Sequence, residues 1–322
     1  MDRNLALEVV RATEAAALAS ARLMGRGDRE GSDRVAVEAM HQTLSGIAMA
    51  GELIIGQGER AQAPMLYVGE RVGRARPGDP EVELAVDALE GTKLCATGAA
   101  NAISVIAMAE KGKLLRAPDV YMEKIAVGPG GYGAVDLTRP PRDNLRRVAD
   151  ALGKYIEDLT VVILDRPRNE KLVAALRETG ARIKLIGDGD LAGALSTCFP
   201  ETGVDMLMGI GGAPEGVISA AALRCVGGDF QGRLAFRGEE EKERARGAGL
   251  ADPDRVFGLD DLADGHVLFA ATGVTNGDFL KGVRFTGRAA VTHSVVMRSR
   301  TATVRRIQTE HHFVESRQSH GW

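Results

Sequence analysis

The sequence predicts an α/β fold class, in which helices and strands alternate along one chain. Apolar residues recur at helical spacing in long segments, and short apolar runs bounded by glycines and turns lie between these segments. The chain shows no internal repeat. With 322 residues, 44% of them hydrophobic, it can bury one large core or two smaller ones. We expect two subdomains, residues 1–150 and residues 151–322.

The first part of the chain carries two long helical patterns. Residues 5–23 are rich in Ala, Leu and Val at helical spacing, and the glycines that follow stop the helix. A second helix begins near Ser32 and Asp33, where apolar residues recur at steps of three and four. Short strands are then expected at residues 53–55, 65–68, 84–86 and 103–107. Their ends converge on the acidic segment 87–92.

From about residue 142 the sequence predicts a regular alternation of strands and helices. The expected helices are residues 144–152, 171–179 and a segment ending near residue 222, with a solvent-exposed charged helix at 239–246. The expected strands are residues 161–164, 183–186, 206–210, 266–271 and a hairpin of 292–298 with 301–307. The tail 316–322 is polar and is expected to be frayed.

The most informative motif is the segment 87–92, Asp-Ala-Leu-Glu-Gly-Thr, which follows an apolar strand. Asp87 and Glu90 can face one cation, and the hydroxyl of Thr92 begins the next element near the same ion. Gly91 lets the backbone approach a phosphate closely. The same residues also fit an ordinary acidic turn that caps a helix. The motif alone leaves both interpretations open.

Two further loops follow predicted strands, at the edge where open parallel sheets bind ligands. Asp188-Gly189-Asp190 opens a helix. The segment 211–216 is glycine-rich, and its glycines expose backbone N–H groups at a helix start, which favours an anion such as phosphate. A glycine-rich loop by itself is a weak signal, since many such loops are plain turns.

Composition excludes some classes of partner. A net charge of −3 argues against nucleic acid or an acidic membrane surface as the main partner. No apolar run approaches the ~20 residues of a membrane span, and the first residues do not form a signal peptide, so we expect a cytoplasmic protein. The cysteines, Cys95, Cys198 and Cys225, are odd in number and lie in apolar sequence, which is typical of reduced thiols.

Seven ordered blocks resemble the class II fructose-1,6-bisphosphatases, relatives of the lithium-sensitive, inositol-monophosphatase-like phosphatases. These blocks are residues 4–8, 25–28, 63–67, 117–124, 188–190, 211–216 and 271–275. The resemblance runs almost from end to end. It implies a layered α/β/α/β/α sugar-phosphatase sandwich, with a metal-site subdomain, a sugar-phosphate-binding subdomain that includes the C-terminal strands, and assembly into a homodimer or homotetramer.

The resemblance also implies a reaction, which is the metal-dependent hydrolysis of the 1-phosphate of fructose 1,6-bisphosphate in gluconeogenesis or carbon fixation. Sedoheptulose 1,7-bisphosphate is a further expected substrate. No nucleic acid or membrane partner is implied. Mg²⁺ or Mn²⁺ suits an all-oxygen site better than zinc does.

Residue roles carry over by position in the family motifs. The implied metal ligands are Asp33, Gln57, Asp87, Glu90 and Glu215. The implied catalytic residues are Thr92, which orients the attacking water, with Asp33, Gln57 and Arg29. The implied substrate-binding residues are Glu90, Gly91, Thr92, Tyr121, Arg166, Arg168, Asp188, Asp190, Gly212 and Glu215, with Lys93 as a further candidate. Arg166 and Arg168 are also compatible with simple surface charge around Pro167.

The chain departs from the family pattern at Gln57, where the family has a metal-binding glutamate. Ala61 and Gln62 also replace an acidic pair, and Ala88 replaces a proline. A glutamine oxygen can ligate a hard cation, but it brings no charge and cannot act as a general base. Glu59 can supply a carboxylate from the same side of an extended chain. The alternative function is therefore a degenerate paralogue with little activity, which binds a sugar phosphate or regulates an active partner.

Overall fold

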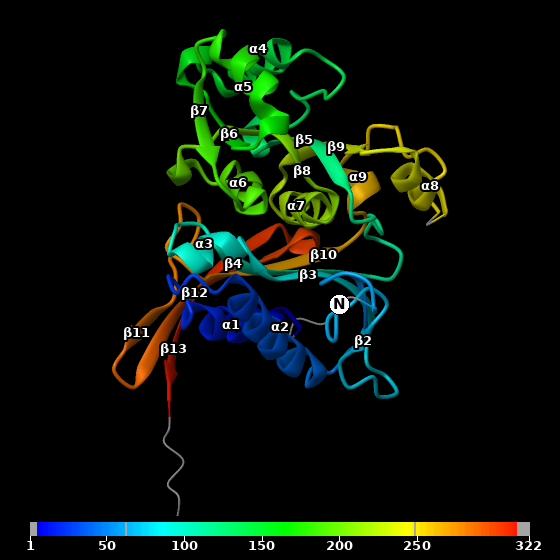
Figure 1. The fold of residues 1–322 in the computed structure, drawn as a ribbon, viewed down its shortest axis with the longest axis vertical. Coiled ribbons are helices and arrows are strands. Elements are labelled where there is room, and N and C mark those ends of the chain that lie inside the picture. Colours follow the sequence, from blue (N-terminus) through cyan, green and yellow to red (C-terminus); the bar gives the residue numbers. More distant parts are fainter. Residues whose placement is uncertain (1–4, 62, 248, 314–322) are drawn as a thin grey trace, which may run out of the picture.

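Layers of helices and sheets alternate in the computed structural model, which describes residues 5–61, 63–247 and 249–313 (Figure 1). One pair of helices covers the outer face of a large sheet, a second pair lies between the two sheets, and a third pair covers the outer face of the small sheet. In that order the pairs are α1 (Leu5–Ala21) and α2 (Arg29–Ser45), α6 (Asp190–Ser196) and α7 (Ala213–Val226), and α4 (Pro141–Leu152) and α5 (Glu170–Arg177). The predicted α/β fold class is confirmed.

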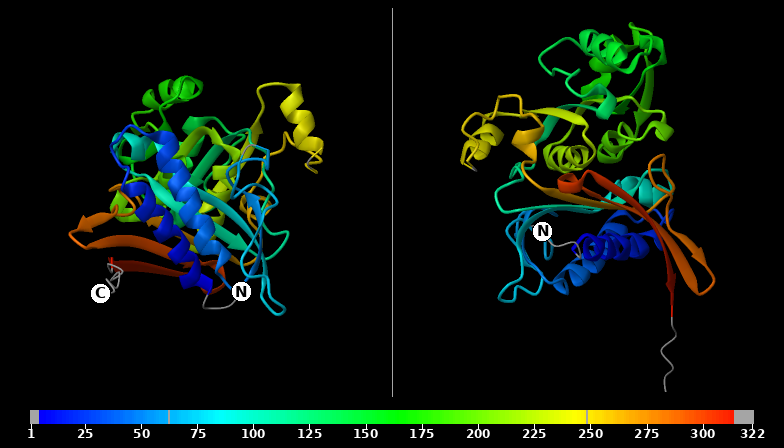
Figure 2. Two further views of the ribbon diagram at one scale, coloured as in Figure 1. Left: turned by 60° about the horizontal axis from the view of Figure 1, so that its bottom comes forward. Right: turned by 180° about the vertical axis from the view of Figure 1, so that it is seen from behind.

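The large sheet takes its strands from both ends of the chain. Within the described residues it has eight strands in the order β11-β12-β10-β4-β3-β1-β2, and β13 pairs with the other side of β12. The strands are β1 (Ala50–Ile55), β2 (Arg71–Val72), β3 (Glu81–Glu90), β4 (Ile103–Ala109), β10 (Val267–Gly273), β11 (Arg284–Thr286), β12 (Ala289–Arg298) and β13 (Thr303–His312). The β1–β3 pair is parallel, whereas β3, β4, β10 and β12 pair antiparallel. Figure 2 shows α1 and α2 side by side across one face of this sheet.

The small sheet is built from the middle of the chain. Its order is β7-β6-β8-β5-β9. The strands are β5 (Tyr121–Val127), β6 (Thr160–Leu164), β7 (Arg182–Ile186), β8 (Met206–Gly212) and β9 (Asp229–Ala235). Strand β6 runs parallel to β7 and β8, so their carboxyl ends meet at one edge. Sheet membership alone does not set subdomain boundaries, and the division at residue 150 stays a prediction.

Among the described residues, the remaining α-helices are short or peripheral. They are α3 (Thr92–Thr97), α8 (Glu239–Gly247) and α9 (Leu259–Leu262). Helix α3 directly follows β3, and α8 is the charged helix expected at 239–246. Helix α2 begins at Arg29, slightly earlier than expected, because the Asp28 carboxylate accepts a hydrogen bond from the Gly31 amide at 2.8 Å and caps the helix.

Apolar side chains fill both faces of the large sheet. On β4, Val105 and Ala107 face the core between the sheets, whereas Ile106 and Met108 face the core under α1 and α2. A strand that is buried on both faces needs a continuous apolar run, which is what the sequence has here. A third cluster, which includes Ile163, lies between the small sheet and the helices α4 and α5.

One expected strand is wrong. Residues 65–68 form bends and a turn, although all four (Met, Leu, Tyr and Val) are hydrophobic. Leu66 has a φ of 54° and is fully buried, and its carbonyl accepts a hydrogen bond from the Gln57 amide at 2.8 Å. The apolar residues of this segment therefore belong to a turn that packs into the core, and they do not indicate a strand. The tail 316–322 and Gln62 lie outside the described residues.

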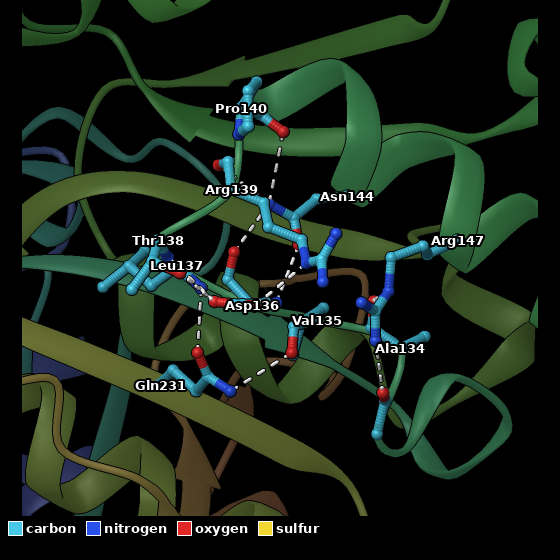
Figure 3. Close-up of polar contacts among 11 residues, drawn as sticks. Ala134, Val135, Asp136, Leu137, Thr138, Arg139, Pro140, Asn144, Arg147 and Gln231 are labelled. Atoms are coloured by element: carbon cyan, nitrogen blue, oxygen red, sulfur yellow. Dashed lines mark hydrogen bonds and ion pairs between the residues drawn. The ribbon is translucent and has the colours of Figure 1, made fainter.

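Polar side chains hold the loop between β5 and α4 in place (Figure 3). Buried Asn144 accepts from the Asp136 amide at 2.8 Å and donates to the Asp136 carbonyl at 2.9 Å. Gln231 on β9 accepts from the Leu137 amide at 2.8 Å and donates to the Val135 carbonyl at 3.1 Å. These bonds satisfy backbone groups that no regular element pairs, and they fix the chain as it leaves the small sheet.

Candidate metal and substrate site

The end of β3 brings two carboxylates to one point. Residues three apart on a regular strand face opposite sides of the sheet. The β3–β4 register shifts between Asp87 and Glu90, and this irregularity lets both side chains reach the same place. Gly91 then adopts a φ of 83° and starts α3, with Thr92 as its first residue. That conformation favours glycine, and a Cβ there would also lie 2.9 Å from a methyl group of Leu94.

A third carboxylate comes from the layer between the sheets. Glu215 lies in the first turn of α7, and oxygen atoms of Asp87, Glu90 and Glu215 all lie within 4.8 Å of one another. The Glu215 Oε2 atom is buried and has no hydrogen-bond partner. A Cβ on Gly212 would lie 1.8 Å from this oxygen, so the glycine leaves the carboxylate room to point into the cluster. A buried, unpartnered oxygen among carboxylates fits a bound cation.

Burial and mutual repulsion make these carboxylates hard to ionise. Burial, together with the nearby charge of Glu215, raises the pKa of Asp87 to about 7, and Asp33 adds a smaller effect in the same direction. Burial raises the pKa of Glu90 well above its usual range, and the charges of Asp87 and Glu215 add to this effect. Burial also raises the pKa of Glu215, against the opposing charge of Lys124. A divalent cation would relieve this repulsion.

Of the other expected metal and catalytic residues, Asp33 is linked to this cluster by its charge. Asp33 is half-buried on α2, its pKa is raised by burial, and its charge acts on Asp87. Gln57 is half-buried and lies two residues after the end of β1, where Ile55 pairs with Ala85 of β3. Arg29 is exposed at the start of α2.

The expected sugar-side residues lie at the edge of the small sheet where β6, β7 and β8 end. Arg168 places its guanidinium 4.3 Å from the ring centroid of Tyr121 and donates from Nε to the Ile210 carbonyl at 2.9 Å. Arg166 lies 3.7 Å from the Asp188 carboxylate. Lys93 is exposed. Two arginines of the loop after β6 and an aspartate of the loop after β7 thus lie at this edge, which suits a ligand with phosphate and hydroxyl groups.

Sequence reasoning missed two charged residues here. Arg237, just after β9, lies with its guanidinium 4.7 Å from the Tyr121 ring centroid, so two cations flank one ring. Lys124 on β5 is buried, and its Nζ atom lies 2.7 Å from Oδ2 of Asp190. Lys124 lies in the family-like block 117–124, but nothing in the local sequence of that block distinguishes an inward-facing lysine from a surface one.

Comparison with known proteins assigns the family. The family model described as bacterial fructose-1,6-bisphosphatase, glpX-encoded, matches residues 3–311. The chain belongs to this family. The family predicted from the seven sequence blocks is thus confirmed.

Relatives of the glpX-encoded family match over nearly their full lengths. A protein of Synechococcus sp. (strain JA-3-3Ab), named D-fructose 1,6-bisphosphatase class 2/sedoheptulose 1,7-bisphosphatase, is 47% identical over 334 residues, which cover 97% of this chain and 96% of the relative. A protein of the same name from Synechococcus elongatus is 45% identical over 336 residues, covering 97% of each chain.

Within the described part of the chain, no helix combines the length and apolar character needed to cross a bilayer.

Proposed function

We propose that this chain hydrolyses the 1-phosphate of fructose 1,6-bisphosphate in a divalent-metal-dependent reaction, and that it also accepts sedoheptulose 1,7-bisphosphate. Family membership and the names of the Synechococcus relatives support this assignment. The observation that carries it is the cluster of Asp87, Glu90 and Glu215, whose oxygens lie within 4.8 Å beside the Gly91 turn. We place this reaction in gluconeogenesis or carbon fixation.

The cation in this proposal is Mg²⁺ or Mn²⁺. Asp87, Glu90 and Glu215 would hold it, with Asp33 and Gln57 as additional ligands, and the unpartnered Glu215 Oε2 atom supports this set. An all-carboxylate and amide donor set suits hard cations. When bound, the cation supplies Lewis-acid stabilisation of the phosphate charge and lowers the pKa of a water.

The chain's own residues bind and orient the substrate in this proposal. Thr92 positions the attacking water through its hydroxyl, and Arg29 keeps a positive charge near the phosphate that is cleaved. The turn at Gly91 admits that phosphate close to the backbone. The residues that would hold the sugar and its second phosphate are Tyr121, Arg166, Arg168, Asp188, Asp190 and Gly212, with Lys93 at the rim.

Gln57 favours a second candidate, a degenerate paralogue that binds a sugar phosphate or regulates an active partner. Replacing an anionic ligand by a neutral one weakens divalent-cation binding. Loss of a general base typically lowers the rate by ~10²–10⁴. This candidate uses the same binding residues and differs only in turnover. In either case we propose a cytoplasmic homodimer or homotetramer, as the family resemblance implies.

The test is phosphate release from fructose 1,6-bisphosphate with Mg²⁺ or Mn²⁺. Turnover by the native chain that is lost in Asp87→Asn supports the phosphatase. A silent native chain whose activity returns in Gln57→Glu supports the degenerate paralogue. If the native chain and Gln57→Glu are both silent, the substrate assignment is wrong.

A further inference from the structure

A buried lysine lies beneath the candidate site. Lys124 is on β5, in the interior of the small sheet (Figure 1), and its side chain packs against Asp190 of α6 and Gly216 of α7. Its ion pair with Asp190 spans 2.7 Å, and the two side chains are only 2% and 9% exposed. Burying both charges carries a large desolvation cost, and apolar residues of similar volume are often at least as stabilising. Stability alone therefore does not explain a lysine at this position.

The surrounding glycines leave room for this ion pair. A Cβ on Gly211 would lie 1.8 Å from Asp190 Oδ2 and 3.0 Å from Lys124 Nζ. A Cβ on Gly216 would lie 2.6 Å from the sulfur of Met122 and 3.5 Å from Lys124 Cε. The glycine-rich segment 211–216 thus accommodates the side chains packed against it, in addition to any role in anion binding.

The ion pair is joined to the carboxylate cluster through α6. Asp190 is the first residue of α6, and the amide of the next residue, Leu191, donates to Glu90 Oε1 at 3.3 Å. The start of α6 is therefore tied to the small sheet by Lys124 and to the large sheet by Glu90. Asp190 belongs to the proposed sugar-binding residues, and Glu90 belongs to the proposed metal ligands.

We propose that Lys124 is a positioning residue. It fixes the Asp190 carboxylate and thereby holds the sugar-binding loop 188–190 in its position relative to Glu90. Lys124 itself touches no substrate, because its ammonium group is covered by Asp190 and the glycine-rich segment. This inference rests on the proposed function, in which Asp190 binds the sugar. It assigns the lysine an effect on substrate binding that is larger than its effect on turnover.

The test compares Lys124→Met, Asp190→Asn and the double variant, using the full-length protein with Mn²⁺. We expect Lys124→Met to raise the KM for fructose 1,6-bisphosphate about tenfold or more, with a smaller change in kcat. At saturating Mn²⁺, where the effect of the Lys124 charge on Glu215 no longer limits metal binding, the double variant should match the KM of Asp190→Asn alone, since Lys124 acts on the sugar-binding loop through that carboxylate. Lys154→Met is the matched control, because it breaks a lysine–aspartate pair with Asp205 at the opposite end of the same sheet, and its KM should stay unchanged.

Hydrogen–deuterium exchange over residues 186–192 is the second readout, and it does not depend on the substrate. Lys124→Met should speed exchange of this segment, whereas Lys154→Met should not. An unchanged KM and unchanged exchange in folded Lys124→Met overturn the inference. If Lys124→Met does not fold, a double variant with a KM well above that of Asp190→Asn overturns it. An inactive native chain refutes the proposed function instead, and the exchange of residues 186–192 then decides the positioning role.

Discussion

Removing the charge of Asp87 should stabilise the metal-free protein while destroying its metal site. Asp87 lies within 4.8 Å of two other carboxylates, and burial with the charge of Glu215 raises its pKa from an ordinary 3.8 to about 7. A raised carboxyl pKa means that the folded state binds the proton more tightly than the unfolded state does. The folded state therefore loses stability as the pH rises from about 4 to about 7, and the loss is complete above that range.

The magnitude follows from the size of this rise. At about 1.36 kcal/mol for each pH unit, the rise corresponds to about 4 kcal/mol at pH 8. The Asp87 side chain is only half-buried by exposed area, so water screens part of the repulsion, and we expect a gain of about 2 kcal/mol for Asp87→Asn. The Asn oxygen can still accept the 3.0 Å hydrogen bond from the Leu89 amide, so the substitution changes mainly the charge.

Urea denaturation with EDTA at pH 5 and pH 8 measures this effect. Asp87→Asn should exceed the native chain in unfolding free energy at pH 8 by clearly more than at pH 5. Adding Mn²⁺ should reverse the order, because only the native chain gains the free energy of metal binding. Equal gains at both pH values, or a variant that is less stable than the native chain at pH 8 without metal, would refute the reasoning.

Three further predictions concern other parts of the chain. Gln57→Glu should tighten Mn²⁺ binding by about tenfold or more in isothermal titration calorimetry, because it adds an anionic ligand, and an unchanged affinity would place residue 57 outside the site. Glu83→Ala should lower the unfolding free energy by about 3 kcal/mol, since buried Glu83 accepts hydrogen bonds from three backbone amides, and a loss below about 1 kcal/mol would contradict this. Asn144→Ala should cost about 1–3 kcal/mol in the same urea assay without changing KM, because the loop bonds of Asn144 lie away from the site residues; a changed KM would argue against that separation.

Elements with a strong local pattern were predictable from the sequence. Helix α1 and strand β6 have the apolar spacing of their type, and both form close to the expected residues. The strands β5 and β9 were missed because polar residues such as Glu123, Lys124 and Gln231 interrupt their apolar residues. Those polar residues form long-range contacts, and such contacts leave no periodic signal in the sequence.

The same distinction applies to the candidate site. Asp87 and Glu90 are close in sequence, and their shared motif indicates a common location before any fold is known. The approach of Glu215 depends on the stacking of α7 against the large sheet, and only the family resemblance predicted it. Neither the local motif nor the family resemblance assigned a role to Lys124 or Arg237, because each acquires its partner from a different segment of the chain.

Gln57 can be understood through the electrostatics of the cluster it adjoins. The charges of these clustered carboxylates already raise the pKa values of Asp87 and Glu90 in the metal-free protein, and a fourth carboxylate close to Asp87 would add to the repulsion. A neutral amide relieves that repulsion and gives up one anionic ligand, so stability without metal and affinity for metal should change in opposite directions at this position. Gln57→Glu should therefore unfold more easily in EDTA and bind Mn²⁺ more tightly. If only the stability changes, residue 57 influences the cluster through charge alone and is not a ligand.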